Sequence, residues 1–348
     1  MSMLKQKTLA EQECLPQKQA AGEREIPQKY IDLHLHLDGA VTLSIAKRLC
    51  QVQGISLSLT ESELEGRLTV GKDCKSLNDF LRCFELPLSL LQTEIGIETA
   101  VKEVLFEQKR QGVLYAELRF APQLHCEKGL TQQQAIEAAL KGLEAADIRS
   151  NLILCLMRGR GNGRQNAETV GLCEKYLTNE QGVAALDLAG AEGLFPTRDY
   201  TELFAKAAEK KIPFTIHAGE AGGAEDVVLA IKAGARRIGH GVRAADDDRA
   251  VELLKNEGVT LEMCPTSNLL TGAYDMKKYP LKGFMQKGVA VTVNTDDPAI
   301  ENTDIKREFE YAAELCGLSD DEQKMILKNA AAAAFASDAV KKEIIRSL

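Results

Sequence analysis

Short runs of apolar or alternating residues recur from Lys29 to the end of the chain, and amphipathic stretches separate most of them. The runs have the length and apolar character of buried strands, whereas the stretches between them carry the three-to-four-residue spacing of helices. Strands that alternate with helices are typical of βαβ units and a parallel sheet. The predicted strands are 30–37, 113–120, 152–157, 183–188, 214–217, 237–240, 259–264 and 289–294, and the clearest predicted helices are 42–53, 131–143, 200–210 and 225–233.

The number of strands indicates the fold class. Eight predicted strands over about 265 residues match the ~250 residues typical of a closed barrel of eight βα units. We therefore predict an α/β fold, a (β/α)8 TIM barrel, with residues 28–348 as a single domain. A doubly wound open sheet remains an alternative, because a count of strands does not show closure.

Three segments lie outside the repeating unit. About sixty residues separate the first predicted helix from Val113 and include an apolar-periodic stretch at 76–91, so we expect extra helices over the carboxyl-terminal mouth of the barrel. Near the other end, the sequence from Ser319 to Glu322 predicts a capping box, and 330–334 and 339–347 predict closing helices. Residues 1–27 are polar and lack a sustained apolar stripe, which predicts a mobile extension or a loosely docked helix.

Composition and charge exclude several classes of protein. The net charge of −8 makes the chain a poor candidate for binding nucleic acid, which requires clustered positive charge. No apolar run approaches the ~18–20 residues of a membrane helix, so no membrane partner is expected. The nine cysteines form no Cys-x-x-Cys pair, which argues against a zinc ribbon or a redox dithiol. Together with the lack of a signal-peptide core, this favours a reduced, cytoplasmic location.

Histidine is scarce and concentrated. Of the five histidines, all but His125 lie at the carboxyl ends of predicted strands. In a closed barrel those ends share one face, where the active sites of this architecture lie. His34 and His36 alternate on one strand, so both side chains point to the same side, roughly 7 Å apart, and can converge on one metal ion. For this strand alone, an alternation of polar and apolar faces is the alternative, but a parallel strand inside a barrel has no solvated face.

Further polar residues follow other strands. His217 is followed by a turn that places Glu220 at the rim, and His240 ends another strand. The last strand ends in Asp296 and Asp297, which point to opposite sides and can serve different partners, although one of them could instead cap the next helix. Three imidazoles and one carboxylate suit zinc with an open position for water. With an acid and a further histidine nearby, the residues alone predict metal-assisted hydrolysis.

Two other motifs are weaker. His125-Cys-Glu127 matches half of the zinc signature of cytidine deaminases, but its Pro-Cys-x-x-Cys partner is missing, so we expect His125 to be a loop residue. The glycine-rich stretch from Gly159 to Arg164 lacks the Lys-Ser/Thr ending of a phosphate-binding loop. We expect it to form a flexible βα loop from which no helix begins.

Seven motifs in the same order resemble those of the adenosine deaminase family, from about Lys29 to the C-terminus. The resemblance implies a (β/α)8 barrel that holds one zinc ion. It also implies hydrolytic deamination of adenosine and 2′-deoxyadenosine to inosine and 2′-deoxyinosine, with release of ammonia. The motifs are His34-Leu-His-Leu-Asp-Gly-Ala40, Tyr115-Ala-Glu-Leu-Arg-Phe-Ala-Pro122, Asp187-Leu-Ala-Gly-Ala-Glu192, His217-Ala-Gly-Glu220, Gly239-His-Gly241, Cys264-Pro-Thr-Ser-Asn268 and Asn294-Thr-Asp-Asp-Pro298.

The resemblance also implies the roles of individual residues. Glu220 would be protonated and donate to N1 of the purine, and His240 would position the zinc-bound hydroxide and assist its proton transfer. Asp297 would accept from the N7 side of the base. The implied zinc ligands are His34, His36, His217 and Asp296, and the implied substrate-binding set is His36, Asp38, Gly190 and Asp297.

Within that set, Asp38 would bond the ribose 5′-hydroxyl, and the backbone N–H of Gly190 would lie against N3 of the purine.

Three apolar residues match the hydrophobic gate of the family, although a helix that packs on the barrel explains them equally well. They are Phe80, Leu81 and Phe84.

The expected partner is a small purine nucleoside, and the oligomeric state stays open. Adenine deaminases resemble this pattern with Glu at the position of Asp38 and Ser at that of Thr295, so both residues favour a nucleoside here. The alternative is another 6-aminopurine compound: adenine, aminofutalosine or an N6-substituted AMP. A phosphate-bearing substrate also remains an alternative, because three arginines could contact a phosphate: Arg158, Arg160 and Arg164. The fourth strand lacks the bridging lysine of two-metal amidohydrolases, which favours one zinc.

Overall fold

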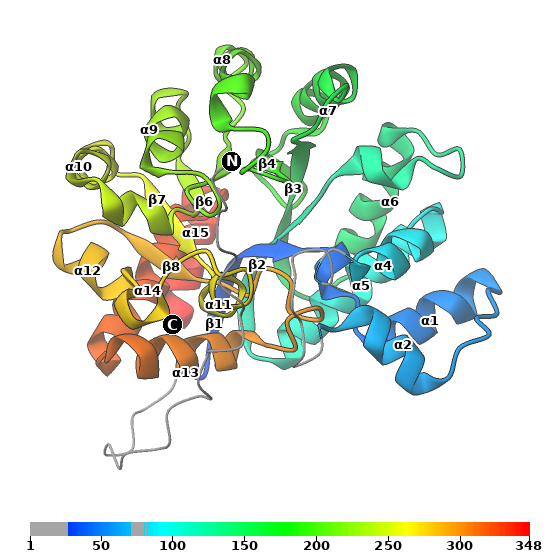
Figure 1. Ribbon diagram of the computed structural model, residues 1–348. Coiled ribbons are helices and arrows are strands. Elements are labelled where there is room, and N and C mark those ends of the chain that lie inside the picture. The colour runs from blue at the N-terminus through cyan, green and yellow to red at the C-terminus, as the bar shows by residue number, and fades with distance from the viewer. Residues whose placement is uncertain (1–26, 71–79, 81) are drawn as a thin grey trace, which may run out of the picture.

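The described residues form eight parallel strands with helices between them. The computed structural model describes residues 27–70, 80 and 82–348. Each strand pairs with the next in two four-stranded groups, β1 to β4 and β5 to β8. Figure 1 shows the strands at the centre, with helices such as α7 to α10 around them. The strands are β1 (Tyr30–His36), β2 (Val113–Phe120), β3 (Arg149–Met157), β4 (Val183–Ala189), β5 (Thr215–Ala218), β6 (Arg237–His240), β7 (Thr260–Met263) and β8 (Val291–Val293).

Two backbone connections close the groups into a barrel. Between β4 and β5, the N–H of Leu186 donates to the carbonyl of Pro213 over 3.0 Å. Between β1 and the end of β8, the N–H of His36 donates to Asp296 O over 2.9 Å, and the N–H of Asp296 donates to His34 O over 2.8 Å. The predicted (β/α)8 barrel is therefore confirmed, and the open sheet is excluded.

The helices follow the predicted pattern closely. Thr42 and Thr131 are N-caps, and the predicted capping box of Ser319 and Glu322 is present. None of the described helices is long and apolar enough to cross a membrane. The helices are α1 (Leu43–Gln53), α2 (Glu61–Leu68), α4 (Glu85–Leu90), α5 (Glu94–Arg110), α6 (Gln132–Glu144), α7 (Gly163–Tyr176), α8 (Thr201–Glu209), α9 (Ala224–Lys232), α10 (Asp248–Glu257), α11 (Pro265–Leu270), α12 (Leu281–Gln286), α13 (Ile305–Cys316), α14 (Asp320–Ala333) and α15 (Asp338–Ser347).

The glycine-rich stretch after β3 differs from its prediction, because α7 begins at its last glycine, Gly163. The side chain of Asn166, in the first turn of α7, accepts from the N–H of Met157 over 2.9 Å and donates to the carbonyl of Met157 over 3.0 Å. These two bonds hold the start of the helix against the end of β3. The expectation that no helix begins there was therefore wrong.

The long insertion between α1 and β2 packs beside the carboxyl ends of β1 and β8. The N–H of Val70 donates to Ile300 O over 2.8 Å, and Ile300 forms a buried apolar cluster with Phe80 and Cys83, against which Phe84 packs. Extra helices at the mouth of the barrel are thus present. The gate role of Phe80 and Phe84, whose rings are 5.8 Å apart, stays a prediction. Leu81, residues 76–79 and the predicted extension up to residue 26 lie outside the described residues.

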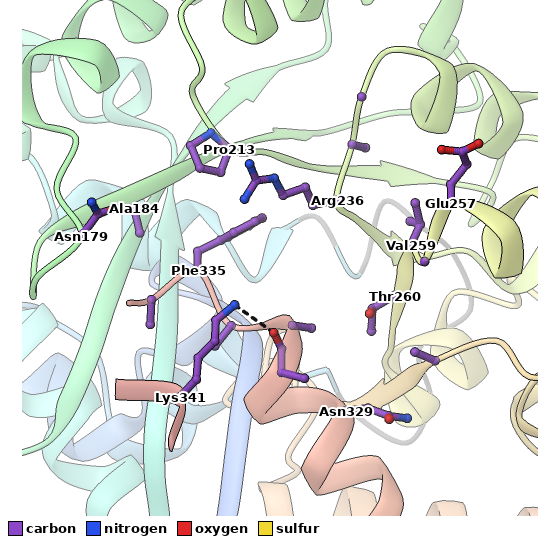
Figure 2. Close-up of a pocket in the computed structure, with 18 of the residues that line it drawn as sticks. Asn179, Ala184, Pro213, Arg236, Glu257, Val259, Thr260, Asn329, Phe335 and Lys341 are labelled. Carbon is purple, nitrogen blue, oxygen red and sulfur yellow. Dashed lines mark hydrogen bonds between the residues drawn. The ribbon is translucent and has the colours of Figure 1, made fainter. Parts of the chain in front are cut away.

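The predicted closing helices are present as α14 and α15, and they lie at the opposite, amino-terminal end of the barrel. Ile31 and Leu33 of β1 pack there against Ala331 and Ile344. A cavity of about 790 Å³ lies at this end (Figure 2), where Arg236, Thr260 and other residues at the starts of the strands face α14 and its C-terminal neighbour Phe335. None of the predicted site residues lines this cavity. The candidate metal-binding and catalytic residues lie at the carboxyl-terminal end of the barrel instead.

A buried carboxyl group in α13 provides a test of this packing. Glu308 accepts from the N–H of Thr266 over 3.0 Å and from the hydroxyl of Thr303 over 2.6 Å. Burial raises the pKa of Glu308 from 4.5 to about 7. An acid with a higher pKa in the folded state stabilises the fold while it is protonated. That contribution is complete below about pH 4.5 and is lost as the pH rises through about 7.

Glu308→Gln should therefore gain stability relative to the unchanged chain as the pH rises from about 5 to about 8, by on the order of 2 kcal/mol. Urea unfolding at both pH values measures the difference. Glu314→Gln, at an exposed position of the same helix, is the matched control and should show no such trend. A stability difference between the Glu308 variant and the unchanged chain that is independent of pH would contradict the assignment.

Candidate metal centre

The four predicted ligands converge on one centre. His34 and His36 come from β1, His217 comes from β5, and Asp296 follows β8. The Nε2 atoms of His36 and His217 are 3.3 Å apart, and Asp296 Oδ1 lies 3.2 Å from His34 Nε2 and 3.4 Å from His36 Nε2. One potential ligand atom from each of the four residues lies within 4.8 Å of the others. The prediction that distant parts of the chain bring these side chains together is thus met.

Two buried carboxylates orient the ligand imidazoles. Glu262 Oε2 lies 2.8 Å from Nδ1 of His34, and Asp187 Oδ2 lies 3.0 Å from Nδ1 of His217. A carboxylate at Nδ1 holds the proton on that nitrogen and leaves the lone pair of Nε2 for a metal. Among the described residues, the buried Nε2 of His34 has no hydrogen-bond partner of suitable geometry, although Asp296 Oδ1 lies 3.2 Å away. The donor set and this unpaired nitrogen fit a bound metal ion.

The charges around His34 also favour a cation. Burial and Arg119 lower the pKa of His34, but Asp296 and Glu262 outweigh them and raise it to about 9. The surroundings of the Nε2 atom of His34 therefore stabilise positive charge. A metal ion at the centre would provide that charge in place of a proton.

Beneath the centre, Arg119 joins the two orienting carboxylates. Its guanidinium donates to Asp187 and to Glu262, each over 2.9 Å, and to the carbonyl of Leu33 over 2.6 Å. Burial alone would raise the pKa of Glu262, but Arg119 and Arg237 hold it well below its usual range. Sequence reasoning assigned Arg119 and Glu262 no role. Arg119 lies in one of the recognised motifs, yet nothing in the sequence indicates what it contacts.

The backbone adopts rare conformations at two site residues. His240 and Asp296 have φ angles of 60° and 61°, in the left-handed region that costs a residue with a side chain about 1 kcal/mol or more. Gly39 is also required by space, because a Cβ there would lie 1.8 Å from Asp297 Oδ1. The fold therefore accepts a strained backbone at His240 and Asp296, and it requires a glycine at position 39, to place the side chains of the site where they are.

Glu220 and His240 lie beside the centre, as predicted. Nε2 of the buried His240 is 3.6 Å from Glu220 Oε2 and 3.7 Å from Asp296 Oδ2. Burial lowers the pKa of His240. The side chain of Glu220 keeps 22% of its surface exposed, so a ligand can reach it.

The loop that carries Glu220 is held by one carboxylate, Glu192. Its two oxygens accept from the backbone N–H groups of Gly219, Glu220, Ala221 and Gly222 over 2.7–3.0 Å. Sequence reasoning placed Glu192 in a motif but gave it no role. Its four hydrogen bonds fix the path of the loop and therefore the position of the Glu220 side chain.

The predicted substrate residues lie around the same end of the barrel. Asp297 is buried, and its Oδ1 has no hydrogen-bond partner among the residues that the structure describes. Burial together with Asp296 and Asp38 raises the pKa of Asp297 well above the usual range. Burial raises the pKa of Asp38 to about 6. Gly190 follows β4 with a φ of 101°, which favours glycine.

The side chain of Arg158 forms hydrogen bonds within the protein. Its guanidinium donates to Phe195 O and to His217 O, each over 2.6 Å. Both terminal nitrogens of Arg158 are therefore bonded within the protein.

His125 does not join the four ligands in the candidate metal group. It lies in a short 3-10 turn (Pro122–His125) between β2 and α6, as a residue of the connection. Its ring is nevertheless fully buried, and Nδ1 lies 2.9 Å from the carbonyl of Leu91. Burial lowers its pKa to about 4. His125 thus packs in the core, which the sequence did not indicate.

A closed (β/α)8 barrel with three histidines and an aspartate at the carboxyl ends of its strands defines a class, the metal-dependent hydrolases built on this barrel. The family profile described as Adenosine deaminase matches residues 29–348. An adenosine deaminase of Haemophilus ducreyi is 44% identical over 90% of this chain and 94% of its own length. One of Enterococcus faecalis is 38% identical over 92% and 95%. The chain belongs to the adenosine deaminase family and is an enzyme, a hydrolase.

Solved structures share the same fold. The crystal structure of an adenine deaminase from Arthrobacter aurescens is 27% identical, with a TM-score of 0.81 over 92% of this chain and 98% of that one. The N6-methyl-AMP deaminase of Arabidopsis thaliana is 24% identical, with a TM-score of 0.78 over 91% and 95%. This second likeness supports the barrel alone.

Proposed function

We propose that this enzyme uses one zinc ion to deaminate adenosine and 2′-deoxyadenosine hydrolytically, which yields inosine products and ammonia. The observation that carries the proposal is the single centre formed by His34, His36, His217 and Asp296, with Glu220 and His240 beside it. The relatives from Haemophilus ducreyi and Enterococcus faecalis, which align over nearly the whole chain, are called adenosine deaminases, and this supports the same reaction.

The four ligands would hold the zinc ion and leave a position open for water. The metal, when bound, acts as a Lewis acid that makes a water molecule reactive near neutral pH. Two further groups of possible ligands exist among the described residues, but both share Asp296 with the first. The groups are His240, Cys264 and Asp296, and Asp296, Asp297 and Glu301. What supports one metal ion per chain is the sequence at the end of the fourth strand, Asp187-Leu-Ala-Gly190, which lacks the bridging lysine of two-metal amidohydrolases.

The remaining residues would act directly on the purine. Glu220, held by its loop, would donate a proton to N1 and so make C6 electrophilic. His240 would orient the attacking water. The resemblance gave Asp297 an accepting role toward N7, but N7 of adenine is itself an acceptor. The raised pKa of Asp297 supports the opposite polarity, in which its protonated carboxyl group donates to N7.

The choice of a nucleoside depends on Asp38. It follows the ligand His36 by two residues, in a 3-10 turn (Asp38–Ala40), and would bond the ribose 5′-hydroxyl. Thr295 contributes less than the sequence indicated, because its hydroxyl donates to Asp32 Oδ2 over 2.5 Å and so supports β1. The second candidate is another 6-aminopurine such as adenine, and the likeness to an adenine deaminase at 27% identity favours it.

An ultraviolet assay with adenosine, 2′-deoxyadenosine, adenine, AMP and aminofutalosine tests the proposal. We expect turnover of the two nucleosides, and turnover of adenine alone would contradict the substrate assignment. Asp38→Ala should raise KM for adenosine by about 10-fold or more, as expected when a buried polar contact is lost. Its KM for adenine, if adenine reacts at all, should stay the same.

We also propose a cytoplasmic location. Six cysteines in the described part of the chain are free thiols, as is usual in a reducing compartment: Cys50, Cys126, Cys155, Cys173, Cys264 and Cys316. A small purine nucleoside remains the proposed partner, with no nucleic acid or membrane.

A further inference from the structure

The histidines in and beside the candidate metal centre are not all held alike at Nδ1. Nδ1 of His34 and Nδ1 of His217 each face a carboxylate, Glu262 and Asp187 respectively. Nδ1 of His240 instead lies 3.0 Å from the side-chain nitrogen, Nδ2, of Asn268 in α11. An amide nitrogen donates and does not accept, so it requires a lone pair at Nδ1 of His240.

The orientation of the Asn268 amide follows from its other contact. The hydroxyl of Tyr279 donates to Asn268 Oδ1 over 2.9 Å, and both residues are buried. Among the described residues, this oxygen is the only acceptor that the Tyr279 hydroxyl finds. A reversed amide would leave the phenolic proton buried without a partner, which costs about 1–3 kcal/mol. Tyr279 therefore holds the NH₂ group of Asn268 toward His240.

We propose that Asn268, held by Tyr279, is a positioning residue that keeps His240 in the tautomer with its proton on Nε2. The ligand histidines His34 and His217 are kept in the opposite tautomer by their carboxylates. The same barrel thus gives its histidines two different functions through the group placed at Nδ1.

The tautomer has a direct chemical consequence. Nε2 of His240 points to the region between Glu220 and Asp296, at 3.6 and 3.7 Å. With the proton on Nε2, His240 donates a hydrogen bond to the attacking water and has no lone pair there to bind the metal. Its role in the proposed reaction, on which this inference rests, is then to hold the water oxygen in place.

Two substitutions at one position separate this role from packing. Asn268→Asp keeps the shape of the side chain but replaces the donor with an acceptor, which draws the proton of His240 to Nδ1. Asn268→Ala removes the side chain. If Asn268 sets the tautomer, Asn268→Asp should lower kcat by about 100-fold or more and at least as much as Asn268→Ala, with KM within about threefold. If it only fills space, Asn268→Asp should be the milder change, and the proposal would be wrong.

Tyr279→Phe tests whether the hydroxyl of Tyr279 orients the Asn268 amide. It removes the hydrogen bond to Asn268 Oδ1 while Asn268 itself stays in place. It should lower kcat with little change in KM. Tyr274→Phe, which removes a hydroxyl bonded to Asp246 at the surface, is the matched control and should leave kcat unchanged. Equal kcat values for the two variants would contradict a role of Tyr279.

The tautomer itself is visible by NMR, without any substrate. The zinc-loaded protein with ¹⁵N-labelled histidine contains only five imidazoles, and His240→Gln assigns the signals of His240. We expect Nε2 of His240 to have the shift of a protonated nitrogen and Nδ1 that of an unprotonated one, with the reverse in Asn268→Asp. An unprotonated Nε2 in the unchanged protein would overturn the proposal. Because no turnover is measured, this result does not depend on which purine the enzyme uses.

Discussion

Glu220→Gln should lower kcat by about 10²–10⁴-fold, the usual contribution of a general acid, while KM and metal content stay close to those of the unchanged enzyme. The amide has nearly the shape of the acid but no proton to transfer to N1 of the purine. Its backbone remains fixed by Glu192, so the loop should keep its path. Steady-state kinetics with adenosine and elemental analysis of the same sample measure both quantities.

The control for this prediction is Glu225→Gln, at an exposed position in the first turn of α9. It makes the same Glu-to-Gln exchange in the same region and should leave kcat unchanged. If Glu220→Gln kept its full activity, Glu220 would not be the proton donor. If the Glu220→Gln variant lost its metal, the main role of Glu220 would be to support the metal centre.

Arg119→Met should destabilise the fold by about 3–5 kcal/mol, the usual cost of removing one partner from a buried ion pair. The thioether fills part of the space but leaves Asp187 and Glu262 buried without their shared cation. Because each of these carboxylates orients a ligand histidine, metal affinity should fall as well, by about 10–100-fold. Urea unfolding of the metal-free protein and a competition titration with a chelator measure the two effects separately.

Arg110→Met, at the exposed end of α5, is the matched control and should change neither quantity. A variant of Arg119 that unfolds like the unchanged chain would mean that the buried charges find other partners. Normal stability with weakened metal binding would assign Arg119 to the centre alone.

Much of the fold and most of the centre follow from the sequence, for a simple reason. A parallel barrel gathers the carboxyl ends of its strands on one face, so a strand pattern that ends in polar residues already predicts which of them meet. Each of the four ligands lies within three residues of such an end: His34, His36, His217 and Asp296. The boundaries were less certain: the last strand, predicted over 289–294, spans only Val291–Val293. Just beyond it, the side chain of Asn294 accepts from the N–H of Leu33 over 3.1 Å.

The groups that support the centre could not be predicted in this way. Arg119 and Glu262 are 143 residues apart in the chain, and both are fully buried charges, which periodicity would place elsewhere. The contact between His240 and Asn268 depends on the direction of an amide, which no pattern of residues reveals. The polarity of Asp297 likewise depends on the burial and neighbouring charges that only the folded chain provides.

The metal content of the purified full chain tests the central claim most directly. Elemental analysis should find about one zinc ion per chain in the unchanged protein and in His125→Gln, which alters the one histidine that lies outside the site. It should find almost none in His217→Ala. A full complement of metal in His217→Ala, or about two ions per unchanged chain, would contradict a single centre built from His34, His36, His217 and Asp296.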